Sequence, residues 1–180
     1  MLEIIIPGGE LWDEAEQTFI QTKSQTLKLE HSLVSISKWE SKWHKPFLST
    51  KEKTYEETLD YIKCMTLSQN IDPDVYKRVT RSNIDQIKDY INNPMTATTF
   101  YERKKGPSNK EIVTAELIYY WMTELNIPVE FQKWHLNKLL TLIRVCEIKR
   151  QPRKKRSSRE IMSMNAALNA ARRQELNSKG

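Results

Sequence analysis

The sequence predicts a mostly α-helical fold: a helical bundle organised around an αα-hairpin, with a small N-terminal β-element and a basic C-terminal helix. Three observations lead to this prediction. After residue 32, apolar residues recur at helical spacing through most of the chain. Before it, short β-branched and alternating stretches are typical of strands. Finally, residues 149–180 carry ten Lys or Arg and only two Glu, which separates a basic tail from a nearly neutral body.

Two stretches predict the N-terminal β-element. Residues 2–6 are apolar and β-branched, and Pro7 follows them at once as a strand terminator. Residues 25–31 alternate apolar and polar side chains, which indicates a half-buried strand. Residues 10–23 begin like a helix and end like a strand, so we expect two or three strands in total. A lone hairpin is marginally stable in water, so this element must pack on a helix.

The first helix is predicted from a row of four large apolar residues. These are Leu33, Ile36, Trp39 and Trp43, which are spaced three, three and four residues apart. This spacing places them on one face of an α-helix. Pro46 restricts the residue before it and so ends the helix.

Three further helix starts are visible in the middle of the chain. Thr54 and Glu57 form a capping box, in which each side chain satisfies a backbone amide near the helix start. Asp72 is followed by Pro73, which suits a cap with proline at the first helical position. Ser82 is the predicted cap of the next helix.

The central αα-hairpin is predicted within residues 108–147. Ser108 and Glu111 form another capping box, and the helix that follows is apolar over more than half of its circumference. We expect Asn126 to end this helix and Pro128 to begin the second one. A connection this short makes the two helices antiparallel neighbours. The rest of the chain is then expected to cover the wide apolar face.

The charge distribution divides the chain into two parts. Residues 149–180 have a net charge of +8, whereas the other 148 residues sum to −2 of the total of +6. We therefore predict a helical domain with an N-terminal β-hairpin over residues 1–148. Residues 149–180 form a basic linker and an amphipathic helix at about 158–176. The apolar stripe of that helix is thin, and a free helix of this length is marginal in water. It needs a partner, which is the body, another copy or a different protein.

The sequence holds no pattern that predicts an enzyme. His31, His44 and His135 have no further His or Cys at the spacing that joins metal ligands on one helix, so we expect no metal or other cofactor. Phosphate-loop, nucleophile-elbow and zinc-protease motifs are absent from the sequence. Cys64 and Cys146 lie in helical patterns and are expected to be reduced thiols. No apolar run approaches the roughly 20 residues that span a bilayer, so we expect no membrane partner.

Two sets of residues are candidates for binding. Tryptophan is enriched in the hot spots of protein interfaces, and a thin helical stripe needs cover. The predicted partner-binding residues are Trp39, Trp43, Trp121, Ile161, Met164 and Leu168. The alternative for the tryptophans is that they pack together in the core. The basic arm comprises Arg150, Arg153, Lys154, Lys155, Arg156 and Arg159. This arm is a solvated linker, a docking arm for an acidic protein, or a means of neutralising nucleic-acid phosphates.

Three segments carry a resemblance to a known family. They are LEHSLVSISKWESKWHKPF at 29–47, ELIYYWMTELNIPVEFQKWHLNKLLTLIRVC at 116–146 and REIMSMNAALNAARRQEL at 159–176. Together they cover roughly 70 of the 180 residues. They resemble a family of small proteins of long-tailed bacteriophages (siphophages) that is placed among the tail assembly chaperones.

The resemblance implies a helical, non-enzymatic protein of the host cytoplasm. Such a protein binds the tape measure protein and other tail proteins while the tail tube assembles, and no catalytic residue transfers from the family. Two alternatives stay open: a minor structural protein of the phage virion, and a nucleic-acid-binding phage regulator that uses the basic arm. A homo-oligomer is also open. A C-terminal helix docked head-to-tail on another copy would build rings or filaments.

Overall fold

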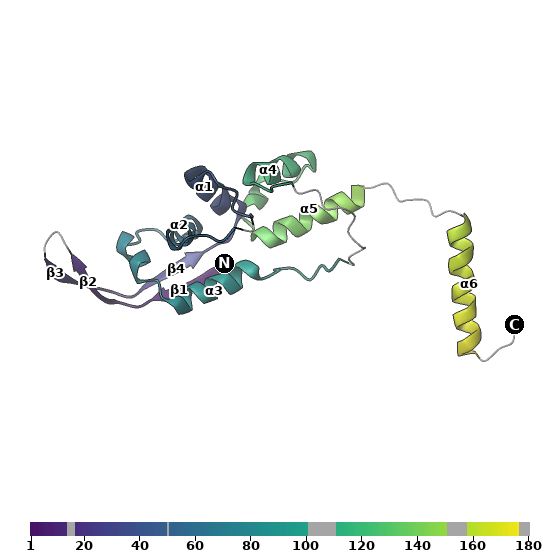
Figure 1. The fold of residues 1–180 in the computed structure, drawn as a ribbon, viewed down its shortest axis with the longest axis horizontal. Coiled ribbons are helices and arrows are strands. Elements are labelled where there is room, and N and C mark those ends of the chain that lie inside the picture. Colours follow the sequence, from purple (N-terminus) through teal and green to yellow (C-terminus); the bar gives the residue numbers. More distant parts are fainter. Residues whose placement is uncertain (14–16, 50, 101–110, 151–157, 177–180) are drawn as a thin grey trace. The chain divides into compact units, whose positions relative to one another are not determined.

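A computed structural model describes most of the chain in two compact units, Met1–Glu147 and Ile148–Gly180 (Figure 1). The described residues are 1–13, 17–49, 51–100, 111–150 and 158–176. They are mostly helical, with a small N-terminal β-element, as predicted. The boundary between the two units falls between Glu147 and Ile148, and the division into functional domains at 1–148 and 149–180 stays a prediction. Below, Met1–Glu147 is called the body and Ile148–Gly180 the C-terminal unit.

The N-terminal strands form one long hairpin in two parts. β1 (Leu2–Ile6) pairs antiparallel with β4 (Gln25–Leu29), and β2 (Gly9–Asp13) pairs antiparallel with β3 (Thr18–Thr22). The described residues of the segment that the sequence left open, 10–23, are therefore largely extended and not helical. Figure 1 shows β2 and β3 projecting beyond the helices of the body.

Gly8 makes the joint between the two strand pairs possible. A Cβ atom at Gly8 would lie 2.5 Å from the carbonyl oxygen of Thr22 and 3.0 Å from the amide nitrogen of Ser24. Both are backbone atoms on the opposite side of the hairpin, so they cannot turn aside as a flexible side chain can. A larger residue at position 8 would push the two strands apart.

The core lies between the β1–β4 pair and the helices of the body. One face of this pair is buried, with Ile4, Ile6, Leu27 and Leu29 each at 1% exposure or less. The opposite face carries Ile5, which is exposed. The alternation predicted for the second of these strands is thus confirmed. Its apolar face packs on helices, as a two-stranded sheet requires for stability.

α1 (Leu33–Trp43) and α2 (Tyr55–Met65) pack against each other and share the core with the sheet. Ser32 caps α1 by accepting a hydrogen bond from a backbone amide of the first turn. The predicted capping box of α2 is confirmed. The Thr54 hydroxyl accepts a hydrogen bond from the Glu57 amide, and the Glu57 carboxylate accepts one from the Thr54 amide.

A 3-10 helix, η1 (Pro73–Arg78), precedes α3 (Arg81–Asn92). Asp72 caps η1, as predicted. The cap of α3 is Thr80 and not Ser82. The reason is that Thr80 has an asparagine three residues further on, whose side chain accepts a hydrogen bond from the Thr80 amide in return.

The helices of the predicted central hairpin begin later than the sequence indicated. α4 (Ala115–Glu124) is capped by Thr114, and the predicted cap Ser108 lies outside the described residues. Pro128 precedes a second 3-10 helix, η2 (Val129–Lys133), instead of an α-helix.

α5 (Leu136–Arg150) is the second helix of the predicted hairpin. The amide of Leu136 donates to the carbonyl of His31 at 2.7 Å, and His135 forms a β-bridge with Ser32. The backbone that enters α5 is therefore bonded to the junction between β4 and α1. This tie favours a helix start at Leu136 over one at Pro128. The antiparallel pairing of α4 with α5 stays a prediction.

The C-terminal unit contains α6 (Ser158–Glu175). Its described side chains are exposed along the whole helix. Arg172 and Arg173 lie in its last turn, where positive charge interacts favourably with the helix dipole.

Candidate interaction surfaces

Trp39 lies in the core of the body. Its side chain is 1% exposed, and its indole nitrogen donates a hydrogen bond to the carbonyl of Glu57 at 2.9 Å. Its ring meets the edge of Phe47, with 5.2 Å between the ring centroids. The helical spacing that joins Trp39 to the buried residues of α1 also turns it away from solvent. Trp39 therefore belongs to the core and not to the partner-binding surface predicted from the sequence.

Trp43, one turn later on α1, is half-buried and reaches the surface. Its ring stacks on Trp39, with 6.2 Å between the centroids. The amines of Lys42 and Lys45 lie 5.7 and 5.6 Å from its ring centroid, within the range of cation–π attraction. Its indole nitrogen is buried and has no hydrogen-bond partner in the described part of the chain. Trp43 and Asp60 line a shallow hollow of about 330 Å³.

A larger pocket of about 420 Å³ opens beside α1 and α2. It is lined by Trp39, Lys45, Pro46, Ser49, Lys51, Glu52, Lys53, Glu57 and Ile112. The amine of Lys45 pairs with the Glu57 carboxylate at 2.5 Å. The amine of Lys53 lies 4.2 Å from the ring centroid of Phe47. Burial lowers the pKa of Lys53, and the Glu57 charge opposes that shift. The lining therefore combines apolar surface with three lysines and two glutamates, and Lys45 and Glu57 neutralise each other.

Trp121 is half-buried on α4. Its neighbours Ile118 and Met122 are buried in the core, and Trp121 packs against that core from the outside. Tyr120 beside it is 59% exposed. Of the three tryptophans predicted as binding residues, Trp43 and Trp121 thus keep an accessible part.

The apolar stripe of α6 is exposed to solvent. Met164 and Leu168, both predicted as binding residues, are 42% and 47% exposed, and Met162 is 74% exposed. Ile161 lies within α6, but its side chain is outside the described part of the structure. Helices of a folded core bury such a stripe. An exposed apolar row of this kind is a candidate face for contact with another molecule.

The structure describes only the two ends of the basic arm. Arg150 ends α5 and Arg159 lies in the first turn of α6, and both are exposed. The other four members lie outside the described residues: Arg153, Lys154, Lys155 and Arg156. The structure therefore supports exposed positive charge at both ends of the arm.

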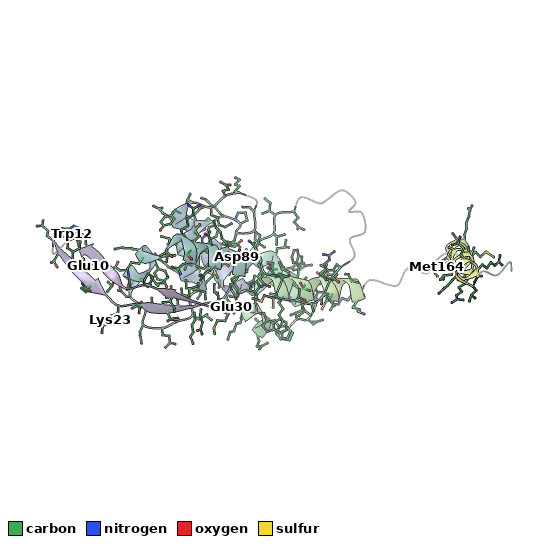
Figure 2. All side chains as sticks on the ribbon, turned by 90° about the horizontal axis from the view of Figure 1, so that it is seen from below. Glu10, Trp12, Lys23, Glu30, Asp89 and Met164 are labelled. Atoms are coloured by element: carbon green, nitrogen blue, oxygen red, sulfur yellow. The ribbon has the colours of Figure 1, made fainter. Side chains whose placement is uncertain are left out.

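Sequence reasoning missed an aromatic pair on the projecting hairpin. Trp12 on β2 and Phe19 on β3 are directly opposite each other in the strand register. Their rings meet edge to face, with 5.0 Å between the centroids, and they are 53% and 63% exposed. Figure 2 shows Trp12 at the outer end of the hairpin, away from Glu30 and Asp89 in the body. The signal was hidden because the pair becomes visible only once residues 10–23 are assigned as two strands.

A buried histidine pair was also missed, because its members come from distant parts of the sequence. The rings of His31 and His135 lie 5.1 Å apart, and Nδ1 of His31 is 2.5 Å from the hydroxyl of Tyr61. Burial lowers the pKa of His31 to about 3, and the nearby His135 adds to the shift. Burial lowers the pKa of His135 as well. Both imidazoles are therefore neutral near pH 7.

This histidine pair does not form a metal centre with other described residues. No group of three or more His, Cys, Asp or Glu side chains converges within the part of the chain that the structure covers. Metal ligation in proteins typically takes three or four such ligands. The pair's hydrogen bonds instead connect α2, α3 and the start of α5, so its role in the described structure is to hold the body together.

Comparison of the chain with protein-family models, with curated proteins and with solved structures gave no match. Among the described residues, no helix combines the length and the apolar content needed to cross a membrane.

Proposed function

We propose that this protein is a phage tail assembly chaperone, a non-enzymatic protein that binds the tape measure protein and other tail proteins during tail morphogenesis in the host cytoplasm. One observation carries the proposal: α6 presents an apolar stripe to solvent in a unit separate from the body. The resemblance of residues 29–47, 116–146 and 159–176 to the tail assembly chaperones supplies the identity of the clients.

The exposed stripe supports a binding role for energetic reasons. A helix of 18 residues without tertiary support is marginal in water. Covering an apolar side chain such as Leu168 removes its surface from water, which contributes about 25 cal/mol for each Å² of apolar surface. A client groove that accepts α6 therefore both orders the helix and gains affinity. This is the helix-in-groove mode of recognition.

The body supplies a second set of contacts in this proposal. Trp43 and Trp121 are partly accessible, and the pocket beside α1 and α2 is lined by apolar surface, lysines and glutamates. We also infer that α4 and α5 form the antiparallel αα-hairpin indicated by their short connection, with η2 inside the turn. The hairpin would then hold Trp121 in a fixed position for a client helix.

A pull-down against fragments of the tape measure protein tests the proposal. Leu168→Asp places a charge on the apolar stripe, and Ala170→Asp makes the same change two residues away, on the other side of α6. We expect Leu168→Asp to weaken client binding about tenfold or more. Ala170→Asp should keep client binding within about threefold of the unmodified chain, because it leaves the apolar stripe intact. It is a matched control because both variants place the same poor helix former in α6. Equal binding by both variants and the unmodified chain would contradict the proposal.

Two simple measurements separate the proposal from its rivals. Mass spectrometry of purified phage particles should not find the protein in fixed proportion to the tail subunits, because a chaperone leaves the finished tail. Its presence there would favour a minor structural protein of the virion. A gel shift at low salt should show weak or no nucleic-acid binding. Retardation that falls steeply with salt would favour a nucleic-acid-binding regulator.

A further inference from the structure

The projecting β2–β3 hairpin is acidic and carries exposed aromatic surface. Residues 9–22 contain one Asp, three Glu and no Lys or Arg, a net charge of −4. Glu10, which is exposed, lies on the same face of β2 as Trp12, because side chains two residues apart share a face. Trp12 pairs across the strands with Phe19, so this face combines an aromatic pair with a carboxylate.

The β2–β3 sheet leaves its strand edges and its aromatic rings exposed. β2 and β3 form a two-stranded sheet, so the outer edge of each strand has no neighbouring strand among the described residues. A two-stranded ribbon is at best marginally stable in water. The rings of Trp12 and Phe19 are 53% and 63% exposed, so a partner that buried them would remove apolar surface from water and stabilise the hairpin.

The C-terminal unit has the complementary properties. Residues 149–180 carry a net charge of +8. On α6, Leu168 is 47% exposed, and Arg172 follows it by four residues, so the two share a helix face. A helix of 18 residues is about 27 Å long. It therefore spans a ribbon of five-residue strands, which is about 17 Å long.

We propose that α6 of one copy of this chain docks on the β2–β3 hairpin of a second copy. In this contact Leu168 covers the Trp12–Phe19 pair, and Arg172, which shares a helix face with Leu168, faces the Glu10 carboxylate. The attraction is between an acidic segment and a basic one, and apolar surface on both sides is buried at the centre. Each element is marginal alone, so each gains order from the other.

A contact of this kind between two copies is head-to-tail. It leaves a free hairpin on one copy and a free helix on the other, to which further copies can bind.

Sedimentation velocity on the full chain, over a range of concentrations at low salt, measures this contact. The hairpin variant Glu10→Lys/Asp13→Lys and the helix variant Arg172→Glu/Arg173→Glu should each weaken self-association about tenfold or more. Combining all four changes reverses both partners and should restore association to within about threefold of the unmodified chain. Raising the salt concentration should weaken association of the unmodified chain.

Glu116→Lys/Glu130→Lys is the matched control. Both residues are exposed, lie in another acidic part of the body and undergo the same change of charge. We expect this variant to associate within about twofold of the unmodified chain. Equal weakening by the control and the hairpin variant would overturn the proposal. So would a chain that stays monomeric at low salt, or a four-fold variant that shows no recovery.

Self-association is measured without any client, so it stands apart from the proposed chaperone function. The hairpin variant keeps the stripe of α6 intact and should still bind tape measure fragments. Loss of self-association with client binding retained is the expected result. Client binding that is absent from the unmodified chain would overturn the chaperone function and leave the contact between copies in place.

Discussion

The helices α1 and α6 carry similar apolar patterns, but the two patterns have different surroundings. In α1 the row through Leu33, Ile36 and Trp39 is buried to 1% exposure or less. In α6, Leu168 belongs to a row with the same three- and four-residue spacing and is 47% exposed. Helical spacing thus determines which face of a helix is apolar, and other segments of the chain determine whether that face is covered.

The difference lies in the tertiary bonds that each helix has. α1 packs against α2, and the buried carboxylate of Glu40 accepts hydrogen bonds from the amides of Phe47 and Ala115, both at 2.7 Å. These bonds join α1 to the loop that follows it and to the start of α4. α6 belongs to a separate unit with exposed side chains along its length. The body therefore has a buried core that includes α1, whereas the described side chains of α6 are exposed.

The largest effect is expected from removing the best-buried aromatic ring of α1. Trp39→Ala should lower the free energy of unfolding by about 3–5 kcal/mol, because it leaves a cavity and removes the hydrogen bond to Glu57. The matched change Trp12→Ala, on the exposed hairpin, should lower it by less than about 1 kcal/mol. Urea denaturation followed by circular dichroism measures both values. Similar losses for the two variants would remove the distinction between core and surface aromatics.

The next effect concerns the carboxylate that ties α1 to α4. Glu40→Gln replaces one accepting oxygen by an amide donor, which faces a backbone amide and leaves it without a partner. We expect a loss of about 2–3 kcal/mol in the free energy of unfolding. Glu56→Gln is the control, since Glu56 is exposed in the first turn of α2 and should change stability by less than about 0.5 kcal/mol. Urea denaturation measures the free energy of unfolding of both variants, and equal losses would contradict the role given to Glu40.

The buried histidine pair predicts how the stability of the body depends on pH. The pKa of His31 falls from an ordinary 6.5 to about 3 on folding, so between these values the unfolded chain binds a proton that the folded chain does not. The free energy of unfolding therefore has its full value above about pH 6.5, where His31 is neutral in both states, and it falls as the pH drops below that value. The loss is about 1.4 kcal/mol for each pH unit, or about 2 kcal/mol between pH 8 and pH 5. His135 shifts in the same direction and adds to it.

His31→Gln keeps a polar partner for Tyr61 and removes this titration. We expect the variant to lose about 2 kcal/mol less than the unmodified chain between pH 8 and pH 5. His44→Asn is the control, because His44 is exposed at the end of α1 in a left-handed conformation that asparagine tolerates. If His31→Gln keeps the full pH dependence, the assignment of the dependence to this pair fails.

Local signals in the sequence predicted part of the fold correctly. The capping box of Thr54 and Glu57 and the alternation around Leu27 and Leu29 depend on neighbours in the sequence, and both are confirmed. Asp72 before a proline was sufficient to place η1. These features involve residues at most four apart, so the sequence contains them in full.

The features that the sequence did not reveal depend on distant partners. Glutamate is usually a surface residue. The sequence does not show that Glu40 is buried, because the backbone amide that it accepts from, that of Ala115, lies 75 residues away. His31 and His135 meet across more than a hundred residues. The aromatic pair of Trp12 and Phe19 required the strand register to be known. Among the binding candidates, tryptophan alone did not distinguish a buried ring from an accessible one.

The smallest effect is expected on α6. Leu168→Asp should leave the urea midpoint of the body unchanged, within about 0.5 kcal/mol, since the helix is not part of the buried core. The same change at a buried position of equal size, Leu139→Asp, should unfold the body. A clear loss of stability in Leu168→Asp would show that α6 packs on the body.

Hydrogen exchange of the full chain, measured at a concentration where it is monomeric, tests the central claim most directly. We predict that the amides of α6 exchange rapidly while those of α1 and α2 are protected by the free energy of global unfolding. Adding tape measure fragments should then protect α6 and leave the rates in α1 and α2 unchanged. Strong protection of α6 in the isolated monomer would contradict the account, because it would mean that the exposed stripe is already covered by its own body.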